Sequence, residues 1–179
     1  MTSHPVITNL RIIGLAGRAG CGKDLAAAYL ELRGYHRVAL ADPIKLIVAN
    51  LGGPGELMKG NKPVRHLWQL AGTECGRAID AELWIKVLLA SLKLAYDVLG
   101  WDRFVVSDVR FPNEADALRA WGGKIIEIRR STGRPGEQAG EHASETEPGK
   151  LQAEYVIRND GTVPELCAEL KAGLDGLGF

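Results

Sequence analysis

Cysteine is scarce in this sequence. Three cysteines occur among 179 residues, at Cys21, Cys75 and Cys167. An odd number at such wide spacing argues against a disulfide framework and against a zinc site, whose ligands recur at short spacing. The sequence therefore predicts a protein of a reducing compartment, the cytoplasm.

An excess of charge of either sign is also lacking, because 22 basic residues stand against 22 acidic ones. Proteins that bind nucleic acids usually carry a basic excess that neutralises phosphates. No nucleic-acid partner is therefore expected. The basic residues are instead candidates for binding a small anionic ligand. The sequence leaves open whether the protein forms a homodimer.

No uninterrupted apolar segment is long enough to span a membrane. The most apolar stretch, residues 83–101, is broken by Lys86, Lys93 and Asp97, whereas about 18 nearly charge-free residues are needed to cross a bilayer. The N-terminal segment lacks the charged start and apolar run of a signal peptide. We expect no membrane partner and interpret 83–101 as a buried amphipathic helix.

Apolar, β-rich segments alternate with helical patterns along the chain. Strands are predicted at 10–16, 37–41, 104–108, 124–129 and 154–158. Helices are predicted at 23–33, 43–50, 64–77, 80–99, 112–121 and 164–174, and a glycine- and proline-rich loop at 51–63. This alternation predicts an α/β fold, a five-stranded parallel sheet with helices on both faces, which binds ligands at the carboxyl ends of its strands. No linker divides 1–179, so one domain is expected.

Residues 17–24 read GRAGCGKD and match the phosphate-binding pattern G-x-x-x-x-G-K, placed between a predicted strand and a helix. The glycines permit a tight turn that brings several backbone N–H groups onto phosphate oxygens, and the start of the helix adds its positive dipole end. A glycine-rich turn with a lone lysine is the alternative. The residues expected to bind ATP are Gly17, Arg18, Ala19, Gly20, Cys21, Gly22, Lys23, Asp24 and Leu25.

Two carboxylates are candidate ligands of Mg²⁺. Asp24 stands where the pattern usually has serine or threonine, and its carboxylate is a hard oxygen ligand suited to magnesium. Capping of the helix N-terminus is the alternative for Asp24. Asp108 ends the predicted strand 104–108, where it would reach the same metal ion from beside the phosphate-binding strand.

Arginines supply the candidate contacts to a transferred phosphoryl group, since guanidinium binds phosphate bidentately. Arg110 follows Asp108 closely, and a surface ion pair with Glu114 or Asp116 is the alternative. Arg130 belongs to a polar segment, about 129–150, that is expected to form a lid excluding water. A plain surface loop is the alternative there. With Lys23, these two arginines are the expected catalytic residues.

A polar stripe lies on the predicted helix 64–77. Arg65, Gln69 and Thr73 are spaced by four residues, and Arg77 lies further along the same helix. Such a stripe suits an anionic, hydrogen-bonding ligand, and a solvated helix face is the alternative.

Taken in order, these segments resemble the bacteriophage-type deoxynucleoside monophosphate kinases over nearly the whole chain. The matching segments are GKD at 22–24, ADPIK at 41–45, RHLWQLAGTECGR at 65–77, Asp80, Trp84, SDVRFPNEADALRAWGGKIIEIRR at 107–130, HASE at 142–145 and IRNDG at 157–161. Leu25 departs from this family, which commonly has threonine there.

The resemblance implies a three-layer P-loop fold of the nucleoside monophosphate kinase type. It implies ATP and Mg²⁺ on the P-loop, phosphorylation of deoxynucleoside monophosphates in the cytoplasm (that of the host, if a phage encodes the chain), and a lid containing Arg130. A substrate-binding helical region, about 43–100, would hold the nucleotide. The implied substrate residues are Asp42, Lys45, Arg65, Gln69, Thr73, Arg77 and Trp84.

Two other functions stay open. Animal-type phosphomevalonate kinases share a GKD loop, an SD-x-R segment after a strand and an acidic HASE-like segment, so another small-molecule kinase is the first alternative. A non-catalytic nucleotide-binding switch is the second, although the number of arginines around the expected lid argues against it.

Overall fold

The computed structural model describes residues 10–52, 70–131 and 151–179. The chain forms two compact units. The first unit comprises Met1–Val38 and Trp101–Phe179, and the second comprises Ala39–Gly100.

The first unit is built on a sheet of five parallel strands in the order β2-β3-β1-β4-β5. The strands are β1 (Arg11–Ala16), β2 (His36–Val38), β3 (Arg103–Val109), β4 (Lys124–Arg129) and β5 (Tyr155–Arg158). The three inner strands have apolar central residues and are mostly buried, as expected for parallel strands that are covered on both faces. The predicted five-stranded parallel sheet is confirmed.

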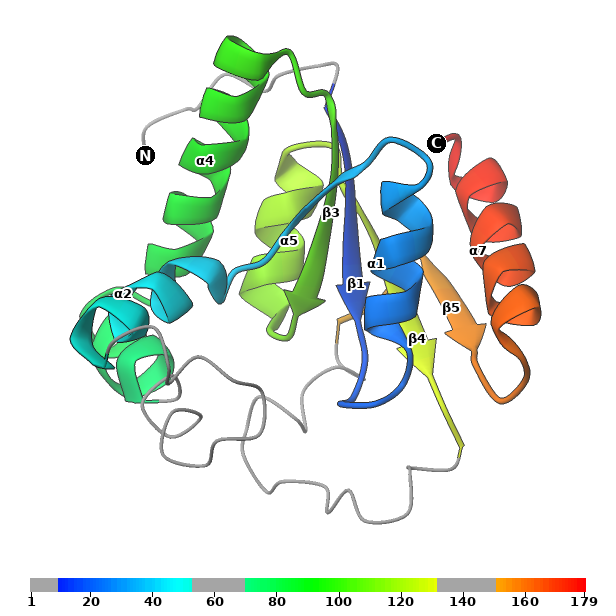
Figure 1. Ribbon diagram of the computed structural model, residues 1–179, viewed down its shortest axis with the longest axis horizontal. Coiled ribbons are helices and arrows are strands. Elements are labelled where there is room, and N and C mark those ends of the chain that lie inside the picture. The colour runs from blue at the N-terminus through cyan, green and yellow to red at the C-terminus, as the bar shows by residue number, and fades with distance from the viewer. Residues whose placement is uncertain (1–9, 53–69, 132–150) are drawn as a thin grey trace. The chain divides into compact units, whose positions relative to one another are not determined.

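Helices cover both faces of this sheet (Figure 1). The helices α1 (Lys23–Glu31) and α7 (Val163–Leu177) share one core cluster with Ile13, Ile128 and Ile157. The helix α5 (Pro112–Ala120) lies on the opposite face, where a Cβ added to Gly14 would lie 3.2 Å from the Leu118 side chain. The three-layer arrangement is therefore confirmed within the first unit.

The second unit consists of helices in the described part of the chain. These are α2 (Asp42–Gly52), the π-helix η2 (Leu70–Arg77) and α4 (Leu83–Leu99). The indole of Trp84 joins two of them, because its N–H donates to the Gly72 carbonyl at 2.8 Å. Gly72 and Gly76 permit close packing, since a Cβ at either position would lie under 3 Å from the side chains of Ile44 and Trp84 respectively.

Several predicted elements differ from the structure in their bounds. The second strand ends at Val38, because the Ala39 N–H donates to the Asp42 carboxylate at 2.9 Å and the chain turns into α2. The helix predicted from Asp80 begins at Leu83, with Glu82 as its N-cap, because the Asp80 carboxylate instead accepts the Glu82 N–H and pairs with Lys86. The loop predicted at 51–63 lies mostly outside the described residues, and its first two residues belong to α2.

In the described parts of the chain, no helix combines the length and the apolarity needed to cross a bilayer.

Candidate active site

The phosphate loop, residues 17–22, connects β1 to α1 at the carboxyl edge of the sheet (Figure 1). Two of its glycines are required by its shape. Gly17 has φ 138° and a Cβ there would lie 2.2 Å from the Ile128 carbonyl oxygen, while Gly22 has φ 111° and forms the N-cap of α1. Both backbone conformations strain residues that have a Cβ. The glycine spacing predicted from the sequence thus corresponds to a real steric requirement.

The start of α1 is available to an anion. Its N-cap is Gly22, which has no side chain to occupy the first-turn amides. Those amides and the helix dipole together favour a bound phosphate. Arg18, Ala19 and Gly20 are exposed at the tip of the loop, and the Leu25 side chain is half-exposed.

The Lys23 side chain folds back onto the backbone of the phosphate loop. Its Nζ donates to the carbonyl oxygens of Gly17 and Arg18, each at 2.7 Å, and lies 3.9 Å from Sγ of Cys21. Burial lowers the pKa of the Lys23 ammonium, the Cys21 sulfur opposes this, and the positive charge of Arg110 adds to it. Lys23 is thus held where a phosphate could replace the two carbonyl oxygens.

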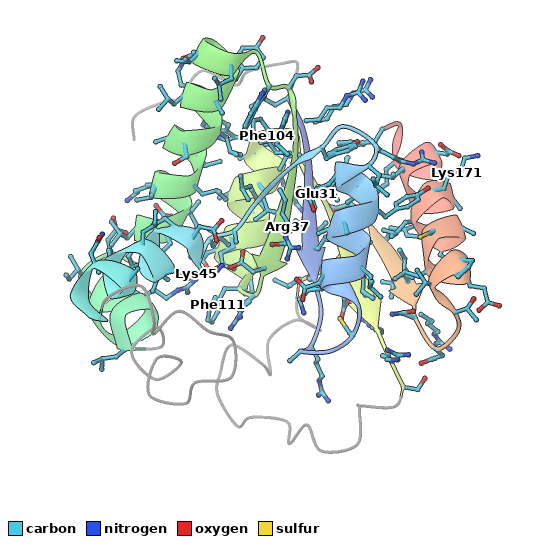
Figure 2. The ribbon with its side chains drawn as sticks, in the orientation of Figure 1. Glu31, Arg37, Lys45, Phe104, Phe111 and Lys171 are labelled. Carbon is cyan, nitrogen blue, oxygen red and sulfur yellow. The ribbon has the colours of Figure 1, made fainter. Side chains whose placement is uncertain are left out.

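Asp24 lies in the first turn of α1 but is not its N-cap. Its carboxylate forms an ion pair with the guanidinium of Arg37, which is labelled in Figure 2 and comes from β2. No sequence pattern distinguishes Arg37, because a charged residue in a short edge strand is ordinary. The N-cap position of α1 thus belongs to Gly22, and the Asp24 carboxylate is paired with a cation.

Asp108 lies beside the base of the phosphate loop. The register between β1 and β3 shifts there, because Gly14 is opposite Val106 whereas Ala16 is opposite Val109. One extra residue on β3 is accommodated at this point, and such irregularities commonly redirect a side chain at a functional edge. The partly buried Asp108 occupies this irregular segment.

The residues present suit magnesium better than zinc. In the described ranges, no three His, Cys, Asp or Glu side chains gather as a metal-binding cluster. Magnesium needs less from a protein, since one or two carboxylates together with substrate phosphates and water complete its coordination. Asp24, in the first turn of α1, and Asp108, near the end of β3, carry such carboxylates.

Arg110 follows β3 directly and is exposed. Its positive charge contributes to the lowered pKa of Lys23, so the two cations lie near each other. The carboxylate of Glu114 accepts the backbone N–H groups of Arg110 and Phe111, at 2.7 and 3.0 Å, and thereby begins α5. Asp116 pairs with Arg119 at 2.9 Å.

Arg130 follows β4 and lies beside Asp160, whose pKa is lowered by hydrogen bonds from Ser131 and, to a smaller extent, by the charges of Arg130 and Arg158. The Ser131 N–H donates to Asp160 at 2.7 Å. This holds the chain just after Arg130 against the end of β5. The rest of the expected lid, 132–150, lies outside the described residues.

Asn159, which sequence reasoning missed, is buried directly beneath the phosphate loop. Its side-chain amide donates to the Cys21 carbonyl at 2.8 Å. The available signal was the polar residue that follows the apolar strand in IRNDG at 157–161.

Some of the expected substrate residues lie within the described part of the chain, and these mainly contact near neighbours in the second unit. Asp42 pairs with Lys45 at 2.7 Å, and both side chains are exposed by about half, with Lys45 labelled in Figure 2. Trp84 is buried and its N–H is bonded to Gly72. Arg77 ends η2 and Thr73 lies within it, while Arg65 and Gln69 lie outside the described residues.

Comparison with known proteins identifies the family. The family model of deoxynucleotide monophosphate kinase matches residues 56–170. A protein of Acanthamoeba polyphaga mimivirus named "Putative deoxynucleotide monophosphate kinase" is 30% identical over 190 residues, covering 92% of this chain and 96% of that protein. The deoxynucleotide monophosphate kinase of Enterobacteria phage T4 is 31% identical over 110 residues, covering 60% of this chain and 44% of that kinase.

Among solved structures, the shikimate kinase of Aquifex aeolicus superposes with a TM-score of 0.54 at 15% identity, over 94% of this chain and 98% of that enzyme. At this identity the likeness shows the fold alone, that of a P-loop kinase. The family model and the mimivirus relative go further, and they show that this chain belongs to the deoxynucleotide monophosphate kinase family.

Proposed function

We propose that this protein transfers the γ-phosphoryl group of ATP to a deoxynucleoside 5′-monophosphate, releasing ADP and a deoxynucleoside diphosphate. The observation that carries the proposal is Lys23, which is held at the N-terminus of α1 by two carbonyl oxygens of a glycine loop. Family membership supplies the class of acceptor.

Positioning and charge stabilisation account for the catalysis, because phosphoryl transfer needs little covalent chemistry from a protein. Lys23 and the loop amides hold the β- and γ-phosphates. The bond between the γ-phosphorus and its bridging oxygen breaks, and a bond to an oxygen of the acceptor phosphate forms. Arg110, whose charge already acts on Lys23, stabilises the negative charge of the equatorial oxygens. Arg130 contributes from the end of β4.

Asp24 and Asp108 are the residues that would hold magnesium. Bound magnesium neutralises phosphate charge. Asp24 would then exchange some of its interaction with Arg37 for the metal ion, since a carboxylate oxygen has lone pairs for both. Asp108 would approach from β3.

The second unit carries the acceptor side in this proposal. Its region from about 43 to 100 binds the monophosphate through Asp42, Lys45, Thr73, Arg77 and Trp84, together with Arg65 and Gln69. Both units then belong to one kinase domain spanning 1–179, in which the segment from about 129 to 150 acts as a lid. The family resemblance and the positive charges of Lys45, Arg65 and Arg77 support this assignment.

A coupled assay of ADP production tests the proposal. Mg-ATP is combined with a panel of deoxynucleoside monophosphates, ribonucleoside monophosphates and phosphomevalonate. We expect turnover with at least one deoxynucleoside monophosphate. Turnover with phosphomevalonate alone would make the protein a different small-molecule kinase, and ATP binding without transfer to any acceptor would make it a switch.

A further inference from the structure

Asn159 forms hydrogen bonds with two parts of the candidate active site, the phosphate loop and the end of β4. It is only 5% exposed and follows β5 directly. Its side-chain amide donates to the carbonyl of Cys21 in the phosphate loop, and its backbone N–H donates to the Arg129 carbonyl at the end of β4, each at 2.8 Å. Because both partners are carbonyl oxygens, only donor groups suit this position.

The hydrogen bond to Cys21 fixes the orientation of one peptide plane. A trans peptide is planar, so its C=O and N–H point in opposite directions. When the Cys21 carbonyl points inward to Asn159, the N–H of Gly22 must point away from Asn159. Rotation of this peptide would break the buried hydrogen bond and leave two polar groups unpaired, which is unfavourable in a buried position.

Gly22 and Asn159 also match each other in shape. A Cβ at Gly22 would lie 2.3 Å from Nδ2 of Asn159, so the amide occupies the space that any other residue would need. The same glycine has a φ of 111°. The phosphate loop is thus packed against Asn159 at the point where α1 begins.

We propose that Asn159 is a positioning residue for phosphate binding, which presents the Gly22 N–H to the phosphates of ATP by holding the Cys21 carbonyl inward. This inference rests on the proposed ATP site. It assigns to the segment after β5 a task in shaping the phosphate loop that the loop's own sequence does not reveal.

Asn159→Asp tests the inference most sharply, since it keeps the shape but replaces the donor with a carboxylate that repels the Cys21 carbonyl. At about pH 8 we expect the dissociation constant of ADP, measured by calorimetry, to rise about tenfold or more. Burial raises the pKa of such a carboxyl group. Protonation at about pH 6 would restore an O–H donor, so the affinity should recover relative to wild type.

Asn159→Ala provides a second variant that does not depend on protonation. It removes the donor without adding a charge, so we expect a smaller rise in the ADP dissociation constant and no recovery at low pH. In steady-state kinetics of both variants, KM for ATP should rise while KM for the monophosphate stays within about twofold of wild type.

Leu174→Ala is the matched control for a general loss of stability. Leu174 is buried in the same core cluster as Cys21 but lies on α7. We expect a lower melting temperature with an ADP dissociation constant within about twofold of wild type, because cavity formation costs stability without moving the loop.

The outcomes separate the inference from the function on which it rests. If the wild-type protein does not bind ADP, the proposed function fails. If wild type binds ADP and folded Asn159→Asp binds it equally well at about pH 8, only the positioning role fails. The role also fails if both Asn159 variants lose affinity merely in proportion to the fraction unfolded, as measured by circular dichroism.

Discussion

The phosphate loop of the first unit and the expected substrate residues of the second unit are held in different ways. The loop is tied to distant parts of the chain by buried groups, such as Asn159 on Cys21 and the Ile128 carbonyl against Gly17. In the second unit, the charged groups pair with near neighbours in the sequence, as Asp42 does with Lys45, and these pairs are exposed.

This difference indicates that the loop is preorganised, whereas the exposed pairs of the second unit can exchange partners at little cost. Exposed ion pairs contribute about 0–1 kcal/mol, whereas breaking a buried hydrogen bond on one side costs about 1–3 kcal/mol. A deeply buried polar contact of the second unit is the hydrogen bond from the Trp84 indole to the Gly72 carbonyl. Substitutions in the loop should therefore have the larger effects.

Lys23→Ala should have the largest effect. It removes the charge for the β- and γ-phosphates from a site where burial and the loop carbonyls hold it in place. We expect kcat/KM for ATP to fall by about a hundredfold or more. Arg33→Ala, in which an exposed cation near the other end of α1 is removed, should retain near-normal activity. Near-normal activity of Lys23→Ala would mean that the loop does not bind the transferred phosphate.

Gly22→Ala should follow, with an ADP affinity reduced by about tenfold or more. The new Cβ would collide with Asn159 and strain the backbone at a positive φ. Gly34→Ala is the matched control, because Gly34 has φ 83° with nothing near its would-be Cβ. It should cost about 1 kcal/mol of stability and leave ADP binding unchanged. Equal losses of affinity in the two variants would contradict a shape requirement at the loop.

Asp108→Asn should raise the magnesium concentration needed for half-maximal activity by several-fold, about tenfold at most, because a neutral amide is a weaker magnesium ligand than a carboxylate. Asp102→Asn, just before β3 and exposed, should leave the magnesium titration unchanged. An unaltered titration for Asp108→Asn would remove this residue from the metal site.

Trp84→Phe should lower the stability of the second unit by about 1–3 kcal/mol, since the Gly72 carbonyl loses its donor. We also expect KM for the monophosphate to rise a few-fold while KM for ATP is unchanged. Ile85→Val, on the same buried helix face, should cost about 1 kcal/mol without changing either KM. If both substitutions raise KM for the monophosphate equally, the indole has no specific part in acceptor binding.

Lys45→Met should have the smallest effect on stability, under about 1 kcal/mol, because its pair with Asp42 is exposed. KM for the monophosphate should nevertheless rise about two- to fivefold if Lys45 contacts the acceptor phosphate, a modest loss expected for an exposed cation. Lys93→Met, which breaks an equally exposed pair with Asp97, should leave KM unchanged. A shared change in KM would indicate a general charge effect rather than a contact.

The fold of the first unit was largely predictable from the sequence, because the patterns that indicate its strands and its phosphate loop lie in short, continuous segments. Continuous apolar runs mark buried parallel strands, and the glycines of the loop mark a turn that other residues cannot make. Element ends were less predictable. The helix predicted from Asp80 begins later, at Leu83, because the Asp80 carboxylate accepts the Glu82 N–H and pairs with Lys86.

By itself the sequence determined the succession of strands and helices along the chain and the position of the phosphate loop. It also identified Lys23 as the candidate phosphate-binding lysine. Each of these depends on residues that are adjacent in the chain. Only the tertiary structure decided that Arg37 pairs with Asp24 and that Asn159 lies beneath Cys21. Those partners are separated by 13 and 138 residues along the chain, and only the folding of the chain brings them together. Local patterns carry no information about such pairs, so the support beneath the loop became visible only in the fold.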